Sequence, residues 1–386
     1  MLAGARAPGL HAGTIRSLAR YTVAMPVTLR SHAKVNLGLA IGPTRPDGFH
    51  ALATLYQTIE AHDLLTLSVT RDGKGANPVR LTATDRRIPL DGRNTVARML
   101  TAALAFPGRE GLTVRVHIDK RLPIQGGLGG GSGNAAAALV GLERELQRQG
   151  LAAPLAGRDR LRLAEEVGSD VPLFLLGGTV LGVGRGEEVV PLPDAGDLPA
   201  VVALPAEGVS TPAAFRAWDE GLAAQGLTAA QIADRLKELS RALAAAWCEQ
   251  HATGVFSPHP QSPASPGMVA PGSRDLAGTL LSTLVQTGIL LNDFEQVVFR
   301  QHPLLEQIKR VIAGTPANGQ FDAAASASEA VYCALSGSGS AVFGLYASPD
   351  AADAAAGRLN RLGIRALRTR TLGRAEYWSG MVVHEE

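Results

Sequence analysis

A glycine-rich run is the segment of this chain whose residue types most clearly suit chemistry. Five glycines fall within residues 126–131, in the run Pro123-Ile124-Gln125-Gly126-Gly127-Leu128-Gly129-Gly130-Gly131-Ser132. Successive backbone N–H groups in such a loop can converge on an anion, and a helix that follows adds the positive end of its dipole. No lysine follows the glycines as in a Walker A loop, and the spacing does not fit the dinucleotide fingerprint. A phosphate-binding loop and a flexible connection both remain open.

Three further positions have residue types that suit a reaction centre. Lys34 lies near the start of an otherwise apolar strand, where it is either a functional ammonium or a charge that protects a sheet edge. Asp170 comes just before Val171-Pro172 and is either a functional carboxylate or an ordinary cap or turn residue. The run Ser336-Gly337-Ser338-Gly339-Ser340-Ala341 between two strands is either a second binding loop or a tight hairpin.

The elements that must position these residues are a mixture of strands and helices. Alternating apolar residues predict strands, which span residues 35–41, 65–69, 114–118, 179–183, 200–204, 331–335 and 341–346. The glycine-rich run is predicted to open a helix over residues 135–149 with Ser132 as its N-cap. Further helices are predicted over residues 158–167 and 228–247, and residues 44–48 have turn chemistry. This mixture predicts an α+β chain with a domain boundary near residues 190–205.

Composition excludes several classes of protein. The formal net charge is +2 over 386 residues, and there is no lysine- or arginine-rich run, so the chain lacks the electrostatic footprint of a nucleic-acid-binding protein. The two cysteines, Cys248 and Cys333, form neither a disulfide framework nor a metal-ligand spacing. No uncharged apolar stretch approaches the roughly 18 residues of a membrane span.

Two segments are predicted to lie outside the folded core. Residues 1–24 carry three arginines and no acidic residue, which is how an organellar transit peptide can look, but an extension from an upstream start codon is the favoured interpretation. Residues 251–273 hold His259-Pro260, Ser262-Pro263 and Ser265-Pro266 and show little apolar periodicity, which predicts a surface insertion.

The four chemical elements, in this order, resemble the GHMP kinases, whose shared motifs are an N-terminal segment, a glycine-rich phosphate loop and a C-terminal glycine-rich turn. Within that superfamily the chain resembles the 4-diphosphocytidyl-2-C-methyl-D-erythritol kinases over residues 26 to about 375, apart from the insertions. The most specific motif is Arg45-Pro46-Asp47-Gly48-Phe49-His50, and the glycine loop identifies only the superfamily. Matching runs are Ala33-Lys34-Val35-Asn36-Leu37, Gly168-Ser169-Asp170-Val171-Pro172 and Asn292-Asp293-Phe294-Glu295.

The resemblance implies a two-domain fold and a reaction. The fold would be a ribosomal-protein-like α/β domain over residues 25–195 and a ferredoxin-like α+β domain over residues 196–386. The reaction would be phosphorylation of the 2-hydroxyl of 4-diphosphocytidyl-2-C-methyl-D-erythritol in the non-mevalonate isoprenoid precursor pathway. ATP would be the phosphoryl donor, with Mg²⁺ expected, and the enzyme would be cytoplasmic and bacterial rather than plastidic. Neither nucleic acid nor a membrane is an expected partner, and a monomer and a weak dimer remain open.

The resemblance also implies a role for each matched residue. Asp170 would orient the acceptor hydroxyl and take its proton, and Lys34 would pair with this carboxylate and offset charge on the transferring phosphoryl group. The predicted ATP-binding residues are Pro123, Gly126, Gly127, Leu128, Gly129, Gly130, Gly131, Ser132 and, beside the adenine, Asn94. The predicted substrate-binding residues are Asn36, Phe49, His50, Thr211, Phe215, Ser338 and Gly339.

Small departures from the family pattern leave some points open. Phe49 stands where tyrosine is common, and Gly133 stands where a second serine is usual, so the metal ligands are not assigned. Alternatives are another GHMP kinase, acting on homoserine, mevalonate or a sugar, and a non-catalytic nucleotide-binding module. The presence of both Lys34 and Asp170 disfavours the second. An RNA-binding module is disfavoured by the near-neutral charge.

Overall fold

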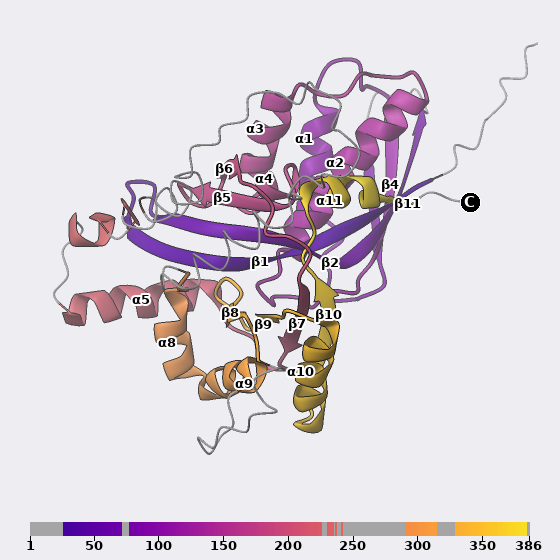
Figure 1. Cartoon of the computed structure of the whole chain (residues 1–386). Helices are drawn as coiled ribbons and strands as arrows, with labels where there is room; N and C mark the ends of the chain where they lie inside the picture. Colours follow the sequence, from indigo (N-terminus) through magenta and orange to yellow (C-terminus); the bar gives the residue numbers. More distant parts are fainter. Residues whose placement is uncertain are drawn as a thin grey trace, which may run out of the picture.

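The computed structural model describes residues 26–71, 77–225, 230–234, 236–237, 241, 290–314 and 329–383. The predicted extension at residues 1–24 and the predicted insertion at 251–273 lie outside the described residues, as does most of the helix predicted over 228–247. Within the described part, two β-sheets and the helices that cover them confirm the α+β prediction (Figure 1).

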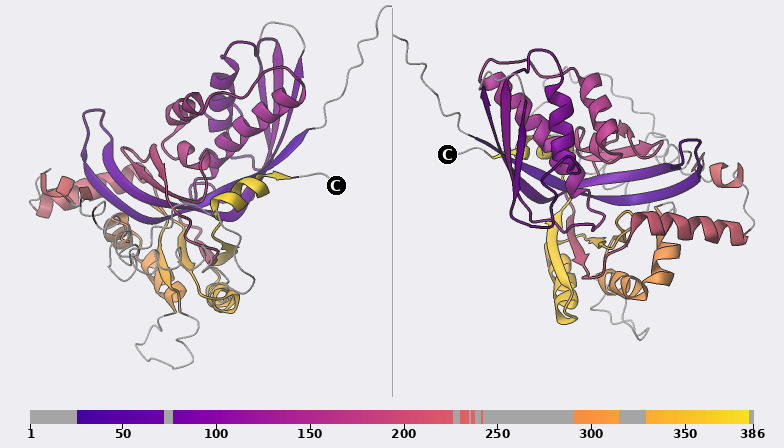
Figure 2. Two further views of the ribbon diagram at one scale, coloured as in Figure 1. Left: turned by 45° about the horizontal axis from the view of Figure 1, so that its top comes forward. Right: turned by 180° about the vertical axis from the view of Figure 1, so that it is seen from behind.

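A long antiparallel hairpin dominates the first sheet and runs across the whole molecule (Figures 1 and 2). Its strands are β1 (Val27–Thr44) and β2 (His50–Arg71), and the register closes with Thr44 opposite His50, at the turn that the sequence predicts. Both strands extend well beyond the predicted 35–41 and 65–69. Polar residues interrupt the apolar alternation outside those ranges, yet Ser31, His32 and Lys34 are buried in the structure.

The first sheet has seven strands in the order β11-β1-β2-β4-β3, with β5 paired to β2 and β6 paired to β5. The strand β3 runs parallel to β4, whereas the other pairs are antiparallel. The remaining bounds are β3 (Val79–Ala83), β4 (Leu112–Asp119), β5 (Thr179–Val183), β6 (Glu188–Pro191) and β11 (Val382–Val383).

Four helices pack with the first sheet: α1 (Thr95–Leu104), α2 (Gly130–Arg148), α3 (Gly157–Val167) and α4 (Val171–Phe174). The helix α2 begins at Gly130, five residues before the predicted start, so the prediction that Ser132 is its N-cap was wrong. Gly129 is the cap residue: it has a left-handed φ of 69° and its carbonyl accepts from the Gly133 N–H at 2.8 Å. A residue with a side chain would be strained in this conformation, so the position suits glycine.

The second sheet is four-stranded and antiparallel, in the order β10-β7-β9-β8. Its strands are β7 (Pro199–Leu204), β8 (Tyr332–Leu335), β9 (Val342–Leu345) and β10 (Arg365–Arg370). The helices beside it are α5 (Thr211–Gln225), α8 (Phe294–Gln301), α9 (Pro303–Ala313) and α10 (Pro349–Arg361). Apolar residues of β1 and β2 pack against this sheet, among them Val35, Leu37 and Leu55. The hairpin is therefore shared by both layers.

The end of the chain returns to the first sheet. Leu372 and two residues of α11 (Arg374–Met381), Tyr377 and Met381, lie in the core beneath α2, and Val383 of β11 pairs with Thr28 of β1. Figure 2 shows α11 lying against the end of the hairpin that is remote from its turn. The predicted division at residue 195 had grouped this segment with the second sheet. No helix within the described ranges has the length and apolarity to cross a lipid bilayer.

Candidate active site

The glycine-rich run lines a cleft of about 350 Å³ at the start of α2. All nine residues predicted to bind ATP contribute to its wall: Asn94, Pro123, Gly126, Gly127, Leu128, Gly129, Gly130, Gly131 and Ser132. Because the run ends in the first turn of a helix of 19 residues, unpaired N–H groups and the positive end of the helix dipole are available here. The cleft therefore has the chemistry of a phosphate site.

The two glycine-rich segments contact each other directly. Gly127 has a φ of 73°, and a Cβ atom added there would lie 2.1 Å from the carbonyl oxygen of Ser336. The Ser336 hydroxyl donates to the Gly127 carbonyl at 3.0 Å, and the Ala341 N–H donates to the Gly126 carbonyl at 3.3 Å. This close backbone approach explains why the loop requires glycine at position 127.

A buried ion pair that the sequence analysis missed lies next to the segment that leads into the glycine loop. Lys120 lines the phosphate cleft, and its Nζ lies 2.6 Å from Oδ2 of the fully buried Asp63. The Asp63 carboxylate also accepts from the backbone N–H groups of Arg121 and Leu122 at 2.8 Å each, and from Nδ2 of Asn134 at 3.1 Å. These contacts fix the chain immediately before Pro123. A lysine and an aspartate 57 positions apart gave no local sign of pairing.

Lys34 and Asp170 meet beside the loop. Nζ of Lys34 lies 3.4 Å from Oδ2 of Asp170, and the lysine side chain is 4% exposed whereas the aspartate side chain is 34% exposed. Nζ also donates to Oδ1 of Asn36 at 2.6 Å, and the Lys34 backbone N–H donates to the Leu128 carbonyl at 3.0 Å. The Asp170 carboxylate is thus partly exposed to solvent, whereas the Lys34 ammonium is buried and fixed by its hydrogen bond to Asn36.

Tyr56 is a further residue that the sequence analysis missed. Its hydroxyl donates to Oδ1 of Asp170 at 3.0 Å, so the two carboxylate oxygens have different partners. The Tyr56 side chain is 2% exposed. Burial and, secondarily, the neighbouring Asp170 charge raise the pKa of Tyr56 well above its usual value, so the phenol keeps its proton. A tyrosine within a strand carries no local signal of such a contact.

A second cleft of about 510 Å³ opens in front of this pair. Six of the seven predicted substrate-binding residues line it: Asn36, Phe49, His50, Thr211, Phe215 and Ser338. Thr211 and Ser338 share a hydrogen bond of 2.7 Å between their hydroxyls, which joins the start of α5 to the second glycine-rich turn. The seventh residue, Gly339, is not in the wall of this cleft, and its carbonyl instead faces Gly127.

Four aromatic rings line one part of this second cleft. The rings of His50 and Phe215 stack with centroids 4.9 Å apart and an interplanar angle of 7°, and Phe294 packs edge-on against Phe215. Phe49 is 53% exposed, and the guanidinium of Arg185 lies 5.0 Å from its ring centroid. An exposed aromatic face next to a cation is suited to stacking on a planar base.

His50 has both ring nitrogens engaged. Because a carbonyl can only accept, Nδ1 carries the hydrogen that is donated to the Gly42 carbonyl at 3.1 Å. Nε2 lies 3.4 Å from Oδ2 of Asp219, which also lines the cleft. These contacts fix the ring orientation at the cleft wall.

Asn94 also has a structural role that the sequence analysis did not predict. It is the N-cap of α1: Oδ1 accepts from the Val96 N–H at 2.9 Å, and Nδ2 donates to the Pro89 carbonyl at 2.7 Å. The next residue, Thr95, donates from its hydroxyl to the Gly131 carbonyl at 2.6 Å. The start of α1 is thereby attached to the phosphate loop.

The two clefts share one residue, Gly127 of the glycine loop, which also lines the cleft that holds Lys34 and Asp170. A phosphate chain in the first cleft would point its end toward a group bound in the second. Such an arrangement serves the transfer of a phosphoryl group between two bound molecules.

Known proteins resemble this chain in sequence and in fold. The family model "GHMP kinases N terminal domain" matches residues 94–178 of this chain. The 4-diphosphocytidyl-2-C-methyl-D-erythritol kinase of Moorella thermoacetica is 34% identical over 349 residues, covering 90% of this chain and 99% of that protein. The chain belongs to the 4-diphosphocytidyl-2-C-methyl-D-erythritol kinase family.

Other relatives agree over shorter or more divergent alignments. The kinase of the same name from Nocardioides sp. is 43% identical over 191 residues, which is 50% of this chain and 62% of that protein. A crystal structure of 4-(cytidine 5'-diphospho)-2C-methyl-D-erythritol kinase superposes with a TM-score of 0.58 at 28% identity, covering 90% of this chain and 99% of that one. The GHMP kinase fold expected from the sequence is thus confirmed.

Proposed function

We infer that this chain transfers the γ-phosphoryl group of ATP to the 2-hydroxyl of 4-diphosphocytidyl-2-C-methyl-D-erythritol, a step of isoprenoid precursor synthesis. The observation that carries this inference is the position of the Lys34–Asp170 pair, in the cleft that shares Gly127 with the phosphate cleft. Membership of the kinase family supports both the ATP dependence and the acceptor. The bacterial relatives support a cytoplasmic location as part of the same proposal.

In the proposed mechanism the acceptor hydroxyl binds next to the Asp170 carboxylate. The hydroxyl oxygen attacks the γ-phosphorus, the bond from this phosphorus to the β–γ bridging oxygen breaks, and ADP leaves. The hydroxyl proton passes to the Asp170 carboxylate, whose Oδ1 is already oriented by the Tyr56 hydroxyl at 3.0 Å. Lys34, 3.4 Å from Oδ2, offsets negative charge on the transferring group. Positioning and charge stabilisation account for most catalysis in reactions of this class.

The donor site would hold the triphosphate through backbone N–H groups of the glycine loop, with Lys120 and Arg93 as side-chain cations in the same wall. Mg²⁺ fits this site only when it is bound together with ATP, mainly through phosphate oxygens. Among the described residues no group of three His, Cys, Asp or Glu side chains could hold a metal ion, and the Asp63 oxygens already have four donors. The Ser132 hydroxyl is the protein oxygen of the loop that would join phosphate oxygens and water around the cation. Bound there, Mg²⁺ would neutralise phosphate charge.

Selectivity for a cytidine nucleotide would come from the aromatic end of the second cleft. Phe49 offers an exposed ring face, and His50 and Phe215 form a stacked wall beside it. Thr211 and Ser338 supply hydroxyls to the wall of the same cleft. The acceptor hydroxyl and the nucleotide base would therefore bind at opposite ends of one cleft.

A coupled assay of ADP release with Mg·ATP and the cytidine-linked substrate tests the function. Phe49→Ala and His50→Ala should raise the KM for this substrate by about tenfold, which corresponds to ~1.4 kcal/mol, and leave the KM for ATP within about twofold. His117→Ala, which removes an exposed imidazole outside both clefts, is the control. No ADP release above background would overturn the function, and equal effects on both KM values would overturn the base site.

A further inference from the structure

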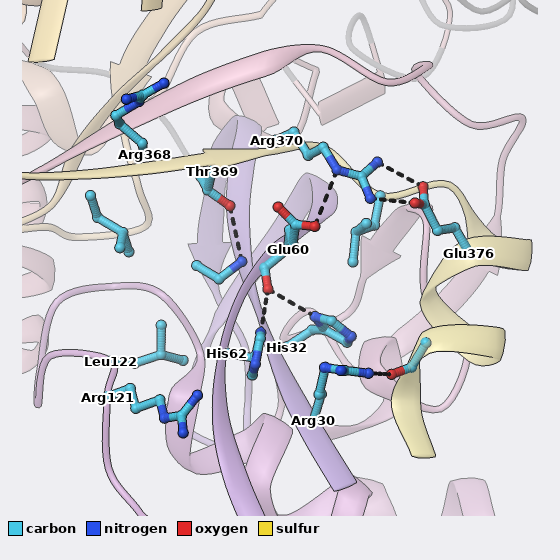
Figure 3. Close-up of a pocket in the computed structure, with 14 residues that line it drawn as sticks. Arg30, His32, Glu60, His62, Arg121, Leu122, Arg368, Thr369, Arg370 and Glu376 are labelled. Carbon is cyan, nitrogen blue, oxygen red and sulfur yellow. Dashed lines mark hydrogen bonds and ion pairs between the residues drawn. The ribbon is translucent and has the colours of Figure 1, made fainter. Parts of the chain in front are cut away.

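A third cavity, of about 550 Å³, lies where the first sheet meets β10 and α11. Figure 3 shows the side chains around it, which come from β1, β2, β10, α11 and the segment after β4. None of its lining residues lines either cleft of the candidate active site. The proposed reaction therefore does not account for it.

The wall of this cavity is rich in guanidinium groups: Arg30, Arg121, Arg368 and Arg370. Its two carboxylates, Glu60 and Glu376, both pair with Arg370 and therefore do not neutralise the other three arginines. In Figure 3 the dashed contacts of Arg370 run to these two side chains.

Arg30 has no carboxylate partner among the residues described here. One of its five N–H groups donates to the Gly380 carbonyl at 2.8 Å, so with respect to the described residues four are available to a ligand. Arg121 and Arg368 pair with Asp119 and Asp353 at the rim. Both rim pairs are exposed, and exposed pairs are worth only about 0–1 kcal/mol, so an anion in the cavity can compete for these guanidiniums.

Two imidazoles complete the polar part of the wall. Nδ1 of His32 and Nδ1 of His62 both contact the Glu60 carbonyl, at 3.2 and 2.7 Å, so each Nδ1 carries a hydrogen. In Figure 3 His62 lies between Arg121 and Arg30. Apolar side chains line the remainder of the cavity: Ala61, Leu122, Leu367 and Leu372.

We propose that this cavity binds a small organic anion through a phosphate or carboxylate group held by Arg30 and Arg121. The apolar part of the wall accommodates the rest of the molecule. Guanidinium groups with unused donors recognise both kinds of anion, because the N–H fork matches paired oxygens. The volume suffices for a metabolite of ordinary size.

The ligand would influence the phosphate loop through Asp63. This carboxylate follows His62 in the chain and accepts from the Arg121 and Leu122 N–H groups at 2.8 Å each. It also pairs with Lys120, which lines the phosphate cleft. A ligand held by Arg121 and packed beside the His62 ring thus contacts both sides of the cluster that fixes the start of the loop. Coupling of this kind is reciprocal: the anion and the nucleotide change each other's affinity by one common factor.

Calorimetric titration of the full chain tests the site. The protein is first saturated with ADP in the absence of added divalent cation, so that the phosphate cleft is filled, and is then titrated separately with sodium pyrophosphate and with sodium citrate. We expect one further equivalent of at least one anion to bind, and the two titrations distinguish phosphate from carboxylate recognition. Arg30→Gln and Arg121→Gln should each weaken this binding by about tenfold or more, since each removes a charged donor.

Arg80→Gln is the matched control, because it removes the same charge from an exposed position on β3 outside the cavity. The site is overturned if neither anion binds at millimolar concentration, or if Arg80→Gln weakens binding as much as the cavity variants. Should one cavity variant fail to fold, the other still decides. The coupling is overturned if pyrophosphate and citrate leave the ADP affinity unchanged. Calorimetry needs no turnover, so failure here leaves the proposed kinase reaction untouched.

Discussion

The Asp170 carboxylate receives two different contacts, one from the Lys34 ammonium and one from the Tyr56 hydroxyl. Tyr56→Phe removes only the second and keeps the buried ring. A hydrogen bond to a charged group is worth about 1.5–3 kcal/mol, and we expect kcat to fall about tenfold or more with little change in the KM for ATP. Steady-state kinetics with ATP and the cytidine-linked substrate measure both quantities.

Tyr346→Phe is the control for this variant. Tyr346 is also fully buried and donates to the Ile312 carbonyl at 2.9 Å, but it lies in the core of the second sheet. It should lower stability and leave kcat near that of the unmodified enzyme. If both variants lower kcat equally, Tyr56 acts through the fold and does not position Asp170.

The sequence predicted those residues of the candidate site that belong to a short motif, but not those whose contacts come from distant parts of the chain. Lys34, Phe49 and His50 could be predicted because each lies in a short run of characteristic neighbours. Tyr56 could not, because its partner lies 114 positions away and its own segment resembles any core strand. The same holds for Lys120 and Asp63, which are 57 positions apart.

The contact between the two glycine-rich turns makes a prediction about Gly127. Gly127→Ala would place a Cβ atom 2.1 Å from the Ser336 carbonyl oxygen, so the turns must separate. We expect the KM for ATP to rise at least about tenfold, because the loop amides then no longer converge. We also expect a loss of stability beyond the ~1 kcal/mol that a left-handed alanine costs.

Gly108→Ala separates these two costs. Gly108 has a φ of 81°, close to the 73° of Gly127, but a Cβ atom there meets no heavy atom within 4 Å. This variant should lose only the backbone term in urea unfolding and keep the KM for ATP. Equal losses in the two variants would show that the contact between the turns contributes nothing.

Secondary structure was predictable where one pattern holds throughout an element. Strands β5 and β7 match their predicted ranges closely because apolar residues make up most of each strand. The helix α1 was missed, although Asn94 is its N-cap, because Asn94 was interpreted only as a nucleotide contact. The start of α2 was misplaced because glycines are poor helix formers, and here the left-handed Gly129 and the adjoining turn impose the helix.

The return of the chain end to the first sheet was not predictable from pattern. The strand β11 has only two residues, and its partner β1 begins some 350 positions earlier. What holds this segment is tertiary packing: Tyr377 and Met381 are each 1% exposed, and the Tyr377 hydroxyl donates to the Phe174 carbonyl at 2.6 Å. A division of the sequence into two consecutive domains therefore cuts through the core of the first layer.

His32, which lies beside this packing, makes the stability of the fold depend on pH. Its ring lies 5.4 Å from that of Tyr377, and burial, followed by the His62 charge, lowers the pKa of His32 from 6.5 to about 4. Between these values the unfolded chain binds a proton that the folded chain does not. This contribution to stability is complete above about pH 6.5 and is lost as the pH falls toward 4, by up to about 3 kcal/mol.

Urea unfolding at pH 7 and pH 4.5 should show this loss. His32→Gln should reduce it, whereas His117→Gln, at an exposed site, should retain it. An unchanged pH dependence in His32→Gln would assign the acid sensitivity to other groups.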